Sequence, residues 1–190
     1  MAEAARVRTS HAEYLALEEA DGLKHELVDG EVIAMTGGTF AHGLLISNLL
    51  AALRAALHGR PCLVLASENR LRLPLYGNTR YPDGQVICGG VRFDVEDPQA
   101  VTNPVLLAEV LSPGSEAADR GERFREYRSI ETLQHYLLIS QARVLVELFS
   151  RGVDGRWTLQ EYGAEGLVAL PALQIELPVR ALYEGLELPA

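Results

Sequence analysis

The stretch PVLLAEVL, residues 104–111, indicates how the whole chain is organised. Seven of its eight residues are apolar and the eighth is the carboxylate Glu109, a pattern typical of a buried strand. Because an unpaired carboxylate is costly to bury, Glu109 must lie in a polar pocket at the strand's end or be balanced by a cation. The turn residues SPGS follow at 112–115, so Glu109 lies near the carboxyl end of the strand, where open sheets gather their ligand sites. We therefore interpret this segment as an active-site strand.

Length and composition predict one globular domain over residues 1–190, with peripheral tails at about 1–10 and 186–190. Of the 190 residues, 48% are hydrophobic and 23% are charged. The net charge of −9 argues against nucleic-acid binding through bulk charge, so binding to DNA requires a local basic patch. Sixteen of the 17 basic residues are arginine and Lys24 is the only lysine, which leaves little choice for a catalytic lysine.

The N-terminal segment, the lengths of the apolar runs and the two cysteines predict a cytoplasmic protein. The N-terminal segment has no apolar h-region, and the chain has no apolar run long enough to span a membrane. Cys62 and Cys88 lack CxxC spacing, so we interpret them as reduced core thiols of a cytosolic protein and expect no zinc site from them.

Periodicity and turn residues predict a mixed order of helices and strands. Helices are expected at about 10–20, at 39–58, from the N-cap Ser115 to about 128, and briefly from Pro178. Strands are expected on both sides of an Asp29-Gly30 hairpin turn, and at 81–87, 104–111, 133–139, 143–149, 157–162 and 173–177; residues 62–77 are expected to form two strands or one long bent strand. This order fits an α/β or α+β domain with one central sheet covered on at least one face.

Three acids stand out in this pattern. Glu31 opens a strand after the hairpin turn, Asp83 follows Pro82 at the start of a strand, and Glu109 lies in the apolar strand. Two carboxylates that converge from adjacent strands suit a hard divalent cation such as Mg²⁺, which can activate water for phosphodiester hydrolysis. Two plainer interpretations stay open, because Asp83 is also ordinary turn chemistry and Glu31 could be a solvated strand residue.

Two further segments could contribute to a site. His42 lies early in the 39–58 helix, either as a surface or cap residue or as a group beside the Gly37-Gly38 turn. In the helix after Ser115, Asp119 and Arg123 are four residues apart, a spacing that allows a salt bridge on a solvent-exposed face. The alternative is that Arg123 points back over the sheet toward Glu109. The basic patch available for a phosphate backbone combines Arg120, Arg123, Arg125 and Arg128 with Arg70, Arg72 and Arg80.

Four segments together resemble a known family: HELVDGEVIAMTGGTFAH (25–42), YPDGQVI (81–87), PVLLAEVLSPGSEAADRGERFREYRSI (104–130) and LQHYLLI (133–139). In this order, DGE, a downstream histidine, PD, EVLSP and D-x-G-x-R-F-x-x-Y are similar to the Uma-type restriction endonuclease family, a bacterial branch of the PD-(D/E)XK nuclease superfamily. The resemblance covers roughly residues 14–186. It implies an α/β, restriction-endonuclease-like fold with a central mixed β-sheet flanked by helices.

The resemblance also implies the site residues. The metal ligands for Mg²⁺ or Mn²⁺ would be Asp83, Glu109, the backbone carbonyl of Val110, and Glu31 from the DGE motif, directly or through water. His42 matches the recurrent histidine of the family. Together with Arg123, it would orient water or contact the scissile phosphate.

One position departs from the superfamily pattern. An ExK motif has a lysine two residues after the glutamate, on the same strand face, and here that residue is Leu111. The lysine that the family usually carries in the next helix corresponds to Arg123. Arginine keeps the positive charge but cannot act as a general base, so Arg123 could stabilise charge on a phosphate without activating water.

We therefore expect a metal-dependent endodeoxyribonuclease that acts on DNA. A homodimer is expected because cutting two strands requires two sites. The alternative is a catalytically inactive nuclease-like domain that binds nucleic acid or a protein partner, which the missing strand lysine and the acidic charge favour. A third possibility is a structural domain with no basic surface beside Glu109.

Overall fold

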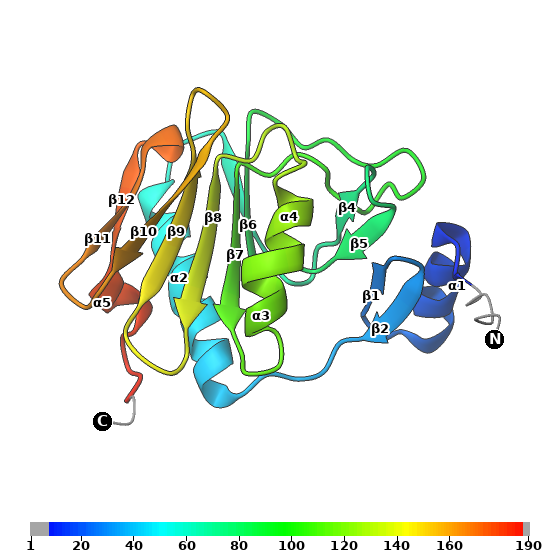
Figure 1. Ribbon diagram of the computed structural model, residues 1–190, viewed down its shortest axis with the longest axis horizontal. Coiled ribbons are helices and arrows are strands. Elements are labelled where there is room, and N and C mark those ends of the chain that lie inside the picture. The colour runs from blue at the N-terminus through cyan, green and yellow to red at the C-terminus, as the bar shows by residue number, and fades with distance from the viewer. Residues whose placement is uncertain (1–7, 188–190) are drawn as a thin grey trace, which may run out of the picture.

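A six-stranded mixed sheet forms the centre of the molecule (Figure 1). The computed structural model describes residues 8–187, so the outer parts of the two predicted tails lie outside the described residues. In spatial order the strands are β10 (Trp157–Tyr162), β9 (Val146–Arg151), β8 (His135–Ser140), β7 (Leu106–Leu111), β6 (Gly84–Cys88) and β3 (Cys62–Ala66). Strands β7 and β8 run parallel, and every other neighbouring pair in this sheet is antiparallel.

A second, four-stranded sheet lies beside the first. Its order is β2 (Glu31–Ala34), β1 (His25–Val28), β5 (Asn78–Arg80) and β4 (Leu71–Leu73), with all neighbours antiparallel. Helix α1 (His11–Asp21) lies at the outer end of this sheet in Figure 1. The C-terminal part forms the hairpin β11 (Leu167–Leu170) and β12 (Ile175–Pro178), joined by the short helix η2 (Pro171–Leu173) and followed by α5 (Val179–Leu182).

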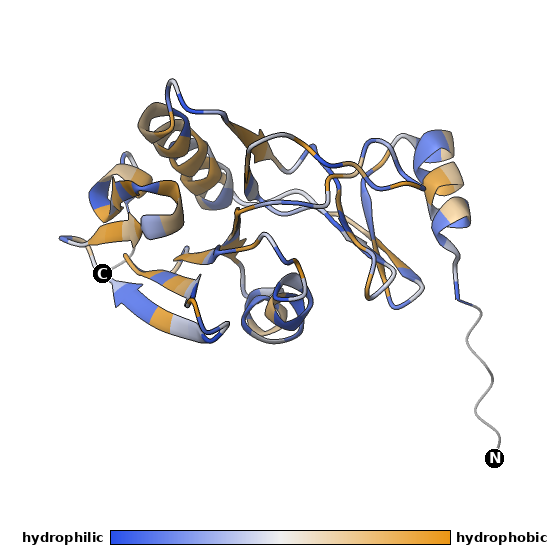
Figure 2. Cartoon of the chain, turned by 90° about the horizontal axis from the view of Figure 1, so that it is seen from above, coloured by the Kyte–Doolittle hydropathy of each residue, from blue (hydrophilic) through white to orange (hydrophobic). Residues whose placement is uncertain are grey.

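Helices cover both faces of the six-stranded sheet. Helix α2 (Phe40–Ala56) lies on one face, and the segment α3 (Glu116–Ala118), η1 (Asp119–Arg123) and α4 (Phe124–Tyr127) lies on the other (Figures 1 and 2). Figure 2 shows α2 as a mainly hydrophobic helix, in keeping with its leucine-rich sequence. The prediction of an α/β fold with a central mixed sheet flanked by helices is confirmed.

Strand β7 separates two hydrophobic cores through the alternation of its side chains. Leu106, Ala108 and Val110 belong to the core under α2. Leu107 and Leu111 belong to the core under α4, which is rich in aromatic side chains. Glu109 shares the face of Leu107 and Leu111, as the period of two predicts, and only 4% of Glu109 is exposed.

Several element boundaries follow from local residue chemistry. Ser10 caps α1 in a capping box with Glu13. Asp29 and Gly30 both adopt positive φ, at 50° and 80°, which a tight two-residue hairpin turn between β1 and β2 requires. Thr39 caps α2 by accepting the amide hydrogen of His42. These predicted boundaries are confirmed.

The prediction that Ser115 is a side-chain N-cap is wrong. Ser115 already has helical backbone angles, and its side chain makes no capping hydrogen bond; its hydroxyl pairs with that of Ser112 at 2.9 Å. The segment that follows is not one regular α-helix either, because a π-helical turn occupies Asp119–Arg123. Such turns often mark functional sites, and this one carries Arg123.

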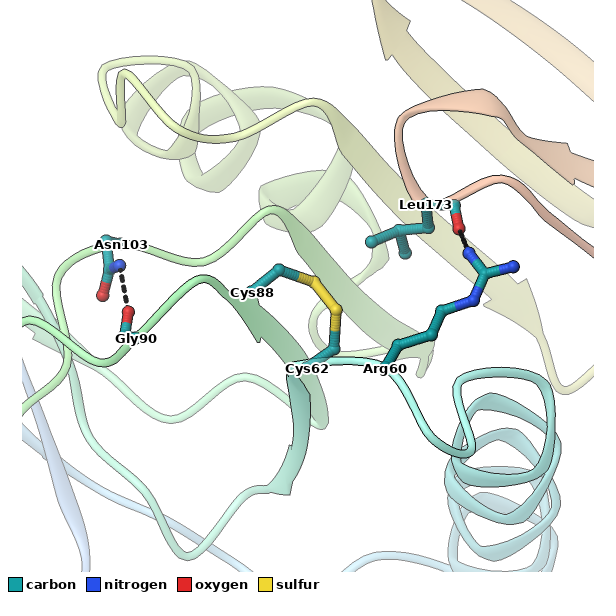
Figure 3. The surroundings of a disulfide bond; sticks show 6 residues. All are labelled: Arg60, Cys62, Cys88, Gly90, Asn103 and Leu173. Carbon is teal, nitrogen blue, oxygen red and sulfur yellow. Dashed lines mark hydrogen bonds between the residues drawn. A yellow bond between two sulfur atoms is a disulfide. The ribbon is translucent and has the colours of Figure 1, made fainter.

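The prediction of two reduced thiols is also wrong, because Cys62 and Cys88 form a disulfide (Figure 3). They are directly opposite each other in the antiparallel pair of β3 and β6, so the register brings the two sulfur atoms together. Next to the disulfide, Arg60 donates to the carbonyl of Leu173, which ties the start of β3 to the C-terminal hairpin. Within residues 8–187, no helix combines the length and apolar character needed to cross a bilayer.

Candidate functional site

A cavity of about 500 Å³ opens at the carboxyl end of β7. The antiparallel register of β6 and β7 places Gly84 opposite Ala108, so Asp83, just before β6, faces the Glu109 end of β7. The acidic, basic and amide side chains that line the cavity come from six parts of the chain: Glu26, His42, Asp83, Glu109, Arg123 and Gln141. The predicted residues Asp83, Glu109, Val110, His42 and Arg123 are therefore brought together, whereas Glu31 is not among the lining residues.

Asp83 and Glu109 are held side by side through the backbone. The amide of Val110 donates to Asp83 Oδ2 at 2.8 Å, and the amide of Asp83 faces Glu109 Oε2 at 3.4 Å. These reciprocal contacts fix both carboxylates at one end of adjacent strands. The predicted convergence of the two acids is thus present in the geometry.

Arg123 is the cation that balances Glu109. Its guanidinium donates to Glu109 Oε1 and to Glu26 Oε2, both at 3.0 Å, and its Nε lies 3.3 Å from Asp119 Oδ1. Of the two alternatives for Arg123, the structure thus has the one that points over the sheet edge toward Glu109. Tyr127 adds a hydroxyl donor to Glu109 Oε1 at 2.8 Å.

His42 projects from the first turn of α2 toward Asp83. Its Nε2 lies 3.3 Å from Asp83 Oδ2, and this hydrogen bond raises the pKa of His42 above its ordinary value. Glycine at position 38 lets the backbone of this loop pass close to the His42 ring, because a Cβ at this position would lie 2.7 Å from His42 Nδ1. Gln141, in the turn after β8, accepts from the Thr39 hydroxyl and donates to the Leu111 carbonyl, so it links the start of α2 to the end of β7.

The third carboxylate in the cavity is Glu26, which the sequence analysis did not single out. Glu26 lies in β1, is buried, and accepts from Arg80 at 2.9 Å and from Arg123. Glu31, at the start of the paired strand β2, is exposed and lines a different cavity with Glu122. A usable signal was present in HELV, residues 25–28, where an acid lies in a short apolar strand much as Glu109 does.

Burial sets the electrostatics of the site. It raises the pKa of Glu109 to about 8, against the opposing charge of Arg123, and the negative charge of Asp83 adds to the rise. Burial also raises the pKa of Asp119. Burial alone would lower the pKa of Arg123, but the surrounding carboxylates, Glu109 foremost, raise it, so the guanidinium stays charged.

The predicted basic patch is wrong for its central members. Arg70, Arg72, Arg80 and Arg123 each pair with carboxylates and are largely withdrawn from solvent. A guanidinium already held by carboxylates offers few donors to a phosphate backbone. Of the predicted patch, Arg125 and Arg128 are exposed, and Arg125 is itself 3.2 Å from Glu122.

The donor set fits a divalent cation. Among the described residues, Asp83 Oδ1 has no hydrogen-bond donor, and it belongs to a carboxylate in the wall of the same cavity as Glu109. Two neighbouring carboxylates disfavour each other's ionised form, which a cation between them relieves. Carboxylate and carbonyl oxygens are the ligands that Mg²⁺ and Mn²⁺ prefer.

Comparison with known proteins gives consistent matches over most of the chain. The model of the Uma2 family, described as "Putative restriction endonuclease", matches residues 11–180. The chain is 35% identical over 179 residues to uncharacterized protein slr1290 of Synechocystis sp. (strain ATCC 27184 / PCC 6803 / Kazusa), with 94% of this chain and 93% of that protein covered. It is 37% identical over 154 residues to uncharacterized protein sll1609 of the same organism, with 81% and 87% covered.

The fold also occurs among solved structures. One of them is the crystal structure of a putative nuclease belonging to DUF820 from Anabaena variabilis ATCC 29413. The two structures superpose with a TM-score of 0.70 over 85% of this chain and 90% of that chain, at 15% sequence identity. At this identity the likeness concerns the fold alone.

Proposed function

Because the chain belongs to the Uma2 family of restriction-endonuclease-like proteins, we propose that it is a metal-dependent nuclease that hydrolyses DNA phosphodiester bonds at the cavity around Glu109. The observation that carries this proposal is the convergence of Asp83 and Glu109 in one cavity, locked by the Val110 amide and faced by Arg123. A buried pair of acids at the ends of two inner strands has no packing role that an apolar pair could not fill better.

Asp83, Glu109 and the carbonyl of Val110 would hold Mg²⁺ or Mn²⁺. The bound ion would supply a Lewis acid for the phosphate and lower the pKa of a bound water. Glu31 enters this proposal only as a more distant contributor, because Glu26 occupies the cavity wall instead.

The side chains around the acids have distinct tasks in this proposal. Arg123 aligns Glu109 and Glu26 through its hydrogen bonds, and its positive charge faces the cavity where negative charge develops on the phosphate. His42 fixes the orientation of Asp83. Tyr127 stays protonated because burial raises its pKa, so its hydroxyl remains a donor to Glu109.

A cleavage assay with plasmid and single-stranded DNA in Mg²⁺ or Mn²⁺ tests the proposal. Glu109→Gln should reduce cleavage roughly 100-fold or more, since it removes a charged ligand at nearly constant volume. Glu147→Gln is a matched control, because Glu147 is also a buried strand glutamate paired with an arginine but does not line the cavity. Cleavage by Glu109→Gln at the wild-type rate would overturn the assignment.

A catalytically inactive nuclease-like domain that binds DNA or a protein partner is the second candidate. It is favoured by Leu111, which lies in the aromatic-rich core where a lysine would be expected, and by the full engagement of Arg123 with carboxylates. In that case the chain binds DNA without cutting it, and Asp83→Ala leaves the affinity unchanged.

We also propose that the active form is a homodimer, since cutting both strands of a duplex requires two sites. Light scattering of the purified chain distinguishes one chain from two. A monomer that nicks a single strand would contradict the dimer but leave the proposed chemistry intact.

A further inference from the structure

A second group of potential metal ligands lies away from the cavity of Asp83 and Glu109. His11, Asp94 and Glu96 each offer a ligand atom, and these atoms lie within 4.8 Å of one another. His11 is the first residue of α1, while the two acids belong to the long loop between β6 and β7. None of the three lines the cavity around Glu109.

The imidazole of His11 is buried but poorly satisfied. Its side chain is only 8% exposed, its Nδ1 lies 3.6 Å from Glu96 Oε2, and its Nε2 is buried without a hydrogen-bond partner among the described residues. Nδ1 is the nitrogen that faces Glu96, and among the described residues it makes no hydrogen bond, so its lone pair is available to a cation when the proton of the neutral ring is on Nε2. Burial and the nearby charge of Arg72 lower the pKa of His11, which favours the neutral form that binds metals.

Backbone amides of the loop hold Asp94 in place. Asp94 Oδ1 accepts the amide hydrogens of Glu96 and Asp97, at 3.0 and 3.1 Å, and so fixes the turn. Asp97 points elsewhere, to Arg70 at 2.8 Å. Arg72 lies 3.8 Å from Glu96, so one guanidinium offsets two carboxylates and the cluster has a net negative charge while His11 is neutral.

We propose that His11, Asp94 and Glu96 form a binding site for a transition-metal cation such as Zn²⁺. One imidazole and two carboxylates suit Zn²⁺ at about 2.0–2.2 Å, whereas Mg²⁺ and Ca²⁺ prefer oxygen ligands alone. Drawing the three ligands to these distances requires a shift of about an ångström, which the exposed side chain of Glu96 allows. Water would complete the coordination.

The site would fasten α1 to the loop. The same two elements are already joined by Arg70, which binds Glu18 of α1 at 2.7 Å and Asp97 of the loop. His11 and Glu18 are seven residues apart, which is two helical turns, so both project from one face of α1. A bound cation would therefore add a second connection at the start of the helix.

Zn²⁺ titration by calorimetry tests this proposal. The full chain should carry Asp83→Asn and Glu109→Gln, which removes the other acidic site from the measurement. We expect one Zn²⁺ per chain, and loss of that equivalent in His11→Ala and in Glu96→Gln. The matched control is His58→Ala, because His58 is exposed at the end of α2 and should leave binding unchanged.

Two outcomes would overturn the site. One is the absence of saturable Zn²⁺ binding in the chain that carries Asp83→Asn and Glu109→Gln. The other is binding of one Zn²⁺ per chain when Glu96→Gln is added, since this position is exposed and misfolding is not expected there. Co²⁺ gives an independent readout, since ligation by His11 should produce visible d–d absorption that His11→Ala abolishes. Because the background chain lacks the acids of the proposed nuclease site, the result does not depend on nuclease activity.

Discussion

Glu26 and Glu31 provide a direct test of which acid from the N-terminal hairpin serves the site. Glu26→Gln should lower DNA cleavage at least tenfold and the free energy of unfolding by about 3 kcal/mol, because it leaves Arg80 and Arg123 undercompensated in a buried place. Glu31→Gln, at an exposed position, should change the stability by less than about 1 kcal/mol, because interactions of exposed charges contribute little. Paired cleavage assays and urea unfolding measure both effects. The reverse order of effects on cleavage would restore the role predicted for Glu31.

The neighbouring glycines Gly37 and Gly38 test how tightly His42 is positioned. A Cβ at Gly38 would lie 2.7 Å from His42 Nδ1, whereas nothing lies within 4 Å of one at Gly37. Gly38→Ala should therefore displace the imidazole from Asp83 and bring the pKa of His42 down toward its ordinary value, while Gly37→Ala should not. NMR titration of His42 in the two variants measures this difference. An unchanged titration in Gly38→Ala would mean that the ring adapts without losing Asp83.

At the residue scale, the sequence predicts those site residues that carry a local clue. Glu109 is conspicuous among apolar neighbours, and Asp83 follows a proline at a strand start. The role of Glu26 depends on a contact with Arg123, 97 positions away in the chain, which no local pattern encodes. Likewise, the arginines looked like a basic patch because their carboxylate partners are distant in sequence.

At the element scale, the disulfide between β3 and β6 should contribute measurably to stability. The bond closes a loop of 26 residues, for which chain entropy predicts a contribution of about 2–4 kcal/mol. The variant with Cys62→Ala and Cys88→Ala should lose about this amount in urea unfolding. A reducing agent should destabilise the wild type similarly and leave the variant unaffected. Two thiols titratable in the native, non-reduced chain would contradict the bond.

Elements with their own caps and turns were predictable, whereas pairings between elements were not. Ser10 and Thr39 each start a helix, and the Asp29-Gly30 turn sets the register of its hairpin. The cysteine pair depends on the register of β3 against β6. These two strands are neighbours in the sheet, but along the chain β4 and β5 of the smaller sheet lie between them. The spacing of the two cysteines in the sequence therefore gave no signal of the bond.

At the scale of the whole molecule, the acidic chain directs much of its positive charge inward. Sixteen arginines are present, yet two of them, Arg80 and Arg123, lie buried against carboxylates of both sheets and of α4. Any DNA binding must therefore rely on the cavity and a bound cation more than on a general positive surface. The net charge of −9, which the sequence alone provides, already indicates this limit.

The pH dependence of folding should carry the signature of His135 at the start of β8. The amide of Ala172 donates to His135 Nε2 at 3.3 Å, and Nδ1 pairs with the Ser150 hydroxyl at 3.0 Å, so the ring is held neutral. Burial lowers the pKa of His135 to about 4 from its ordinary 6.5. Between these values the unfolded chain binds the proton and the folded chain does not. The contribution of His135 to the free energy of unfolding is therefore complete above pH 6.5 and is lost as the pH falls toward 4.

We expect this residue to account for a loss of about 1–3 kcal/mol in unfolding free energy between pH 7 and pH 4.5. Urea unfolding of the wild type and of His135→Gln over this range isolates the effect, because the other titrating groups are common to both chains. The wild type should lose more stability than the variant as the pH falls. His58→Gln, at an exposed position, should parallel the wild type. Parallel curves for the wild type and His135→Gln would show that the imidazole takes up its proton in the folded protein as easily as in the unfolded chain.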